Sequence, residues 1–136
     1  MANLSFRRLS TDWSAEPTAP YIELVPEGAT VRISFVLDPG ACSAGSGEFA
    51  TLRFFGCSRY RTNSAEDHAW YEGKELSSEQ APKWGEFYEV AGDTRVVEDG
   101  RWDVLSEDTP SSRQFLLPFQ DDTFEFVAQD WSLTRA

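Results

Sequence analysis

The sequence has few of the residues on which metal and nucleophile sites depend. Its 136 residues include one histidine and two cysteines, and no C-x-x-C pair occurs. A closed structural zinc site takes four Cys or His ligands, and the chain offers three such residues in all. The G-x-S-x-G elbow, the Gly-rich phosphate loop and the acidic calcium loop are also missing from the sequence. We therefore expect no metal, no cofactor and no catalytic residues.

Long apolar runs are missing as well. No segment approaches the roughly 20 consecutive apolar residues of a membrane-spanning helix. The basic residues among the first ten are not followed by the apolar stretch of a secretory signal. These features predict a cytoplasmic protein, in which Cys42 and Cys57 remain thiols because the compartment is reducing.

Positive charge is scarce. Twelve Lys and Arg residues stand against 23 Asp and Glu, which gives a net charge of -11 and a pI near 4.4. The acidic excess is concentrated between Glu86 and Trp131, where twelve acidic residues accompany three arginines. Nucleic acids and anionic membranes are bound through Lys and Arg, so we expect neither as a partner. Two interpretations of the charge remain, namely solubility and steering toward a basic protein partner.

Aromatic residues are abundant, with ten Phe, five Trp and four Tyr. A chain of this length is typical of one domain and can bury a sizeable core without disulfides. We expect a single domain over 1–136, in which 1–20 form an N-terminal arm laid over a β body at 21–131. The arm contains three apolar residues that can attach it to the body: Phe6, Leu9 and Trp13.

Alternating polar and apolar residues predict several strands in the first half of the chain. Residues 30–37 alternate with period two, and with 21–25 they predict a hairpin whose turn lies at 27–28. The apolar run at 49–57 predicts another strand, in which Gly56 suggests a bulge or a close approach of the backbone. That run is open to continuation through Arg59 and Arg61.

Weaker signals fill the middle of the chain. A capping pattern at Ser64 allows one short helix over 65–72. Three short strands are predicted at 84–90, 94–97 and 101–105, because Gly- and Asp-containing turns separate them.

The last unit is the clearest. Residues 113–120 and 123–131 flank two aspartates and predict a C-terminal hairpin. Pro118 cannot donate a ladder hydrogen bond, which favours an edge position or an outward-facing nitrogen. Each strand carries apolar residues on one face: Phe115, Leu117 and Phe119 on the first, and Phe124, Phe126 and Ala128 on the second. In total the sequence predicts a mostly β fold, an antiparallel β-sandwich or partly closed barrel of seven or eight strands with at most one short helix.

The segments 115–131 and 84–90 together resemble small uncharacterised bacterial proteins that end in a Phe-rich β-hairpin of the type F-x-x-x-F-x-D-x-T-F-E-x-x-A-x-x-W. The resemblance implies a bacterial, cytosolic, mostly β domain. It implies no activity and no catalytic residue.

A mixture of aromatic and acidic residues provides the candidate binding site. Exposed Trp and Tyr with carboxylates between them can dock a basic protein or stack on a sugar ring, because aromatic residues dominate binding hot spots and acids complement basic groups. The candidate ligand- or partner-binding residues are Trp70, Tyr71, Trp102, Glu86, Glu89 and Asp103.

Three functions are compatible with these features. The leading hypothesis is a non-catalytic acidic protein-binding module, an adaptor, inhibitor or immunity-type protein acting on a basic partner. The alternative is a ligand-binding β-sandwich with an aromatic cleft, for carbohydrate. The third is a hydrolase that uses His68 and neighbouring carboxylates, since His68 is the only histidine able to act as a base.

Overall fold

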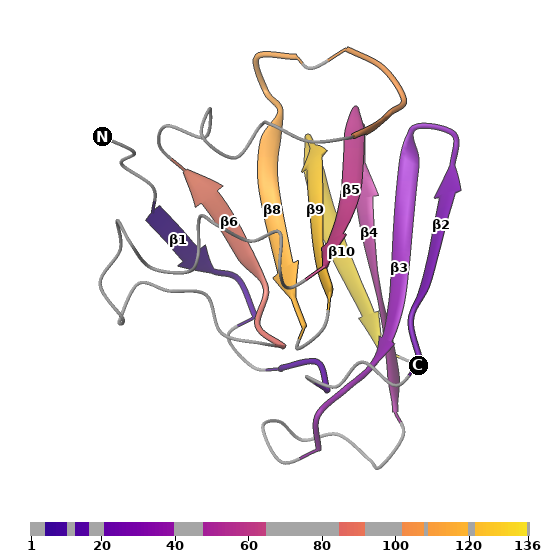
Figure 1. Ribbon diagram of the computed structural model, residues 1–136, viewed down its shortest axis with the longest axis vertical. Helices are drawn as coiled ribbons and strands as arrows, with labels where there is room; N and C mark the ends of the chain where they lie inside the picture. Colours follow the sequence, from indigo (N-terminus) through magenta and orange to yellow (C-terminus); the bar gives the residue numbers. More distant parts are fainter. Residues whose placement is uncertain are drawn as a thin grey trace.

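The protein is seen as a computed structural model that describes residues 5–10, 13–16, 21–39, 48–64, 85–91, 102–107, 109–119 and 122–135. These residues form ten strands in two antiparallel sheets and contain no helix (Figure 1). Neither sheet closes on itself, so the fold is a β-sandwich and not a barrel. No helix capable of crossing a membrane occurs in these segments. The predicted helix at 65–72 and strand at 94–97 lie outside the described residues.

The larger sheet has six strands in the order β1-β6-β8-β9-β5-β7. Every neighbouring pair in it is antiparallel. β7 has two residues, where the sequence predicted a strand over 101–105. The strands of this sheet, in the same order, are Ser5–Arg8, Tyr88–Ala91, Arg113–Pro118, Asp122–Ala128, Arg59–Ser64 and Asp103–Val104.

The smaller sheet has four strands in the order β10-β4-β3-β2. The predicted hairpin of β2 and β3 is confirmed, and Gly28 at φ 65° makes its turn. Pro26 lies within β2 and is tolerated there because β2 is an edge strand. The strands of this sheet, in order, are Asp130–Arg135, Phe49–Phe55, Thr30–Val36 and Glu23–Glu27.

The chain changes sheets at two corners that touch each other. β4 leads into β5 through Gly56, and β9 leads into β10 through Gln129. The backbone N–H of Gln129 donates a hydrogen bond of 2.9 Å to the Phe55 carbonyl. Gly56 has φ 60°, a conformation that favours glycine, and the side chain of Gln129 lies close to it. The predicted continuation through Arg59 and Arg61 exists, but in the opposite sheet.

The C-terminal hairpin is confirmed with one correction. β8 pairs with β9 from Arg113 opposite Ala128 to Pro118 opposite Thr123. The expected single return strand to Trp131 is wrong, because the chain bends at Gln129 into β10 of the other sheet. β8 is an interior strand, and Pro118 ends it beyond the residues that β6 pairs, so its missing N–H costs no bond to β6.

The main core lies between the inner faces of the two sheets and is dominated by aromatic rings. Phe54 of β4 stacks on Phe126 of β9 with ring centroids 4.0 Å apart, and Phe115 stacks on Phe87 at 5.7 Å. The two apolar faces predicted for the C-terminal hairpin are confirmed, since all six residues belong to this core. Burial of these rings is the main source of stability.

The beginning of the chain contributes to both sheet and core. Residues 5–8, within the predicted arm, form β1 at the edge of the six-stranded sheet, where Phe6 packs on a small cluster with Tyr88. Trp13 is buried in the main core and stacks on Phe35 at 5.5 Å. Ala15 forms a bridge to Leu37. Described parts of the arm are therefore integral to the sandwich.

Candidate functional site

The structure describes four of the six candidate site residues. Trp70 and Tyr71 lie outside the described residues, as do His68 and Cys42. Glu89 lies in β6 and Glu86 just before it, whereas Asp103 lies in β7 and Trp102 just before it. Three strands separate β6 from β7, which corresponds to about 19 Å at the usual strand spacing. The four residues therefore form two separate groups.

Glu86 and Glu89 are both neutralised by arginines of the protein itself. Arg8 lies 3.1 Å from Glu86, and the Tyr88 hydroxyl donates a short hydrogen bond to the same carboxylate. Arg113 donates two hydrogen bonds of 2.9 Å to Glu89. The hydrogen bond from Arg113 lowers the pKa of Glu89, although partial burial acts in the opposite direction. Each carboxylate links neighbouring strands of the sheet, and an arginine of the same chain already offsets its charge.

The bond between Glu89 and Arg113 is expected to make stability depend on pH. A carboxyl group whose pKa is lower in the folded than in the unfolded protein stabilises the fold above its unfolded pKa, and this contribution is lost as the pH falls through the folded pKa. Glu89→Gln should therefore flatten the acid side of the curve of unfolding free energy against pH. Urea titrations from neutral pH down to below the carboxyl range measure this, and Arg113→Gln should flatten the same region. An unchanged slope in both variants would contradict the assignment.

Trp102 packs against a buried ion pair. Arg61 of β5 and Glu125 of β9 are 4% and 0% exposed, and Arg61 donates hydrogen bonds of 2.7 and 3.2 Å to the carboxylate. Gln114 donates a further bond of 3.4 Å to Glu125. The guanidinium groups of Arg59 and Arg61 lie over the Trp102 ring, 4.4 and 4.2 Å from its centroid. The Trp102 ring therefore already makes cation–π contacts with two arginines of the same chain.

This ion pair belongs to a second buried layer, on the outer side of the six-stranded sheet. Residues that alternate with the core-facing positions are also buried, among them Val90, Leu116, Thr123 and Val127. Both faces of this sheet are thus withdrawn from solvent over its middle strands. Arg61 and Glu125 were not identified as a pair from the sequence. The one signal for it was the position of Glu125 in the sequence, between two phenylalanines that face the core.

The β7 edge, defined as residues 102–107, combines exposed apolar and acidic side chains. Val104 is 69% and Leu105 40% exposed. Asp103 and Glu107 are exposed too, and neither forms an ion pair with any residue that the structure describes. Burial and the nearby Asp103 carboxylate raise the pKa of the Tyr60 hydroxyl. The Ser58 carbonyl fixes the segment by accepting bonds of 2.7 and 3.1 Å from the amides of residues 105 and 106.

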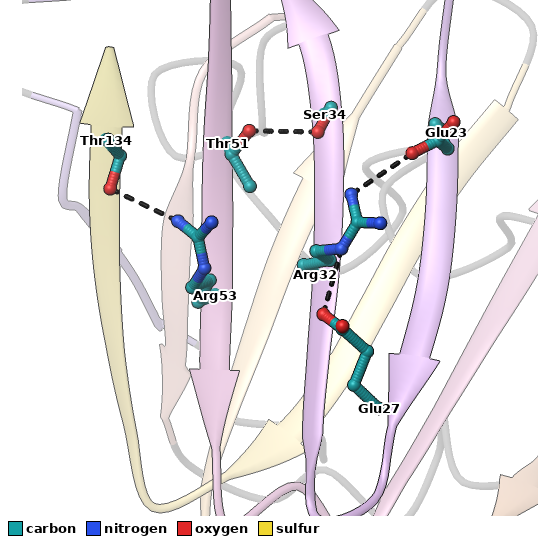
Figure 2. Close-up of polar contacts among 7 residues, drawn as sticks. All are labelled: Glu23, Glu27, Arg32, Ser34, Thr51, Arg53 and Thr134. Atoms are coloured by element: carbon teal, nitrogen blue, oxygen red, sulfur yellow. Dashed lines mark hydrogen bonds and ion pairs between the residues drawn. The ribbon is translucent and has the colours of Figure 1, made fainter. Parts of the chain in front are cut away.

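The outward face of the four-stranded sheet, hereafter the open face, contains no fully buried side chain among its described residues. Figure 2 shows its polar contacts. Ser34 and Thr51 share a hydrogen bond of 2.9 Å, and Arg53 donates one of 3.2 Å to Thr134. Arg32, directly opposite Arg53 in the ladder, forms ion pairs with two glutamates of β2, Glu23 at 3.1 Å and Glu27 at 2.9 Å.

Two observations on the described residues concern nucleophilic and metal chemistry. Cys57 is buried, and its thiol donates a hydrogen bond of 3.4 Å to the Arg59 carbonyl. No group of three or more His, Cys, Asp or Glu side chains able to hold a metal is present in the described segments. Two areas of the described surface carry exposed side chains on strands: the β7 edge and the open face.

The fold places the protein in the class of antiparallel β-sandwiches. Comparison with family models, with curated proteins and with solved structures gave no match.

Proposed function

We propose that the protein is a non-catalytic binding module, an adaptor, inhibitor or immunity-type protein, that takes a basic protein partner at the β7 edge. The observation that carries the proposal is the exposure of Val104, at 69%, in a six-residue segment whose two carboxylates, Asp103 and Glu107, have no ion-pair partner in the described part of the chain. Apolar contact surrounded by charge is the usual composition of a protein interface.

The apolar part of this edge supplies affinity. Val104 and Leu105 follow one another, and the Ser58 carbonyl accepts hydrogen bonds from the backbone N–H groups of Leu105 and Ser106. Full burial of an aliphatic side chain is worth about 1.5–3 kcal/mol relative to leaving it in water. Because the backbone is already fixed, little further ordering is needed when a partner covers these side chains.

The acidic part supplies direction. Glu23, Glu27, Glu86 and Glu89 are each paired with an arginine, whereas Asp103 and Glu107 keep their charge unneutralised by the described residues. The whole chain adds a net charge of -11. A basic partner would be steered toward these carboxylates, and steering acts mainly on the association rate.

The aromatic-cleft alternative has less support. A sugar stacks on an open ring face, but the guanidinium groups of Arg59 and Arg61 lie over Trp102. The other two aromatic candidates, Trp70 and Tyr71, lie outside the described residues. We therefore base the proposal on Asp103 and its apolar neighbours.

Affinity capture with matched variants tests this function. The immobilised protein should retain a basic protein from an extract of its source cells, with elution by salt. The double variants Val104→Ser/Leu105→Ser and Asp103→Asn/Glu107→Gln should each retain at least about tenfold less, because each removes one component of the interface. Glu23→Gln/Glu27→Gln makes the same charge change on the other sheet and should bind normally. Equal retention by all four proteins would refute the proposal.

A further inference from the structure

We propose that the open face of the four-stranded sheet is a second binding surface, at which Arg53 receives a carboxylate from an extended segment of a partner polypeptide. This surface differs in sheet and in charge from the β7 edge. The proposal rests on the surroundings of Arg53 and is independent of the function proposed above.

Arg53 has no ion-pair partner among the described residues. Arg53 lies directly opposite Arg32 in the β3–β4 ladder, and like charges at opposite positions destabilise a sheet. Glu23 and Glu27 both form ion pairs with Arg32 and not with Arg53. The one hydrogen bond of the Arg53 side chain to a described residue goes to the Thr134 hydroxyl, so most of its N–H donors remain available to a carboxylate.

The Arg53 guanidinium is held in place before any ligand binds. Arg53 is on an interior strand, and its bond of 3.2 Å to Thr134 holds the guanidinium along the face (Figure 2). A guanidinium has five N–H donors in a fixed fork, which suits a carboxylate. Small hydroxyl residues lie on one side of it, Ser132 opposite on β10 and Thr51 two residues along β4, whereas Arg32 lies opposite on β3.

The spacing of Arg53 and Phe55 along β4 indicates the class of ligand. Phe55 is 40% exposed, and it lies two residues from Arg53 on the same face of β4. Two residues along a strand span about 7 Å, which is also the spacing of alternate side chains in an extended peptide. A peptide with a carboxylate and an apolar side chain two residues apart therefore matches Arg53 and Phe55. A polyanion is disfavoured because the chain carries a net charge of -11.

Nuclear magnetic resonance titration tests the proposal with a defined probe, the peptide acetyl-Thr-Glu-Thr-Phe-Thr-amide. Addition should shift the Arg53 Nε–H signal and the amide signals of β4 and β10 in a saturable way. The same peptide with Gln in place of Glu should bind at least about tenfold more weakly, because it lacks the charge-assisted hydrogen bonds.

Matched variants locate the interaction. Arg53→Gln should weaken binding of the Glu peptide about tenfold or more, and Phe55→Ser should weaken it as well. Arg7→Gln removes an equal charge from the exposed edge strand of the other sheet and should leave binding unchanged. Shifts that are equal for the Glu and Gln peptides, that persist in Arg53→Gln, or that occur with inorganic phosphate but not with peptide would each overturn the proposal.

Discussion

Replacing Glu125 with glutamine is expected to lower the free energy of unfolding by about 3–5 kcal/mol, because the change removes the buried carboxylate that pairs with the Arg61 guanidinium. Arg61 and Glu125 are almost completely buried and are joined by two hydrogen bonds. The glutamine has nearly the same shape, so lost packing cannot account for such a loss. Urea denaturation of the wild-type and variant proteins, followed by circular dichroism, measures the difference.

Two further variants separate charge from packing. The double change Arg61→Met/Glu125→Met should recover most of the lost stability, since replacing both members of a buried pair with apolar residues is often neutral or stabilising. Glu27→Gln breaks an ion pair on the exposed open face and should cost no more than about 1 kcal/mol. A Glu125→Gln variant as stable as Glu27→Gln would mean that the pair is not held in a dry environment.

Replacing Phe54 with alanine is expected to cost about 3–5 kcal/mol, as is usual for a large-to-small change at a buried phenylalanine. The ring is completely buried and stacks on Phe126 across the sandwich. It also contacts Phe87 and Phe115, so its loss opens a cavity bordered by both sheets.

The next residue provides a matched control. Phe55 follows Phe54 in β4, points to the opposite face and is 40% exposed. Phe55→Ala should change the unfolding free energy by only about 0.5 kcal/mol. Equal losses at the two positions, measured by urea denaturation, would contradict the assignment of inner and outer faces in the four-stranded sheet.

Alternation in the sequence was sufficient to predict the fold class. Period-two patterns identified the β2–β3 hairpin and the inward faces of β8 and β9, because one face of each strand packs on the core. The break at Gln129 was missed, although the parity of apolar residues changes there. Phe124, Phe126 and Ala128 face the core at even positions, whereas Trp131 and Leu133 do so at odd ones.

The pairing of distant segments could not be predicted. β1 and β6 are neighbours although some eighty residues separate them, and no local pattern encodes such a pairing. The same limit applies to the candidate site. The sequence identified Glu86, Glu89 and Trp102 by residue type, but the arginines that contact them lie on other strands: Arg8, Arg113, Arg59 and Arg61. Which carboxylates are neutralised depends on tertiary contacts.

The central claim is that a basic partner binds at the β7 edge, and association kinetics with the captured partner test it most directly. Surface plasmon resonance at several salt concentrations should show that Asp103→Asn/Glu107→Gln lowers the association rate and weakens its salt dependence. Val104→Ser/Leu105→Ser should raise the dissociation rate about tenfold or more, because apolar contacts hold the complex together after it forms. Rate constants that match the wild type in both variants would contradict the claim.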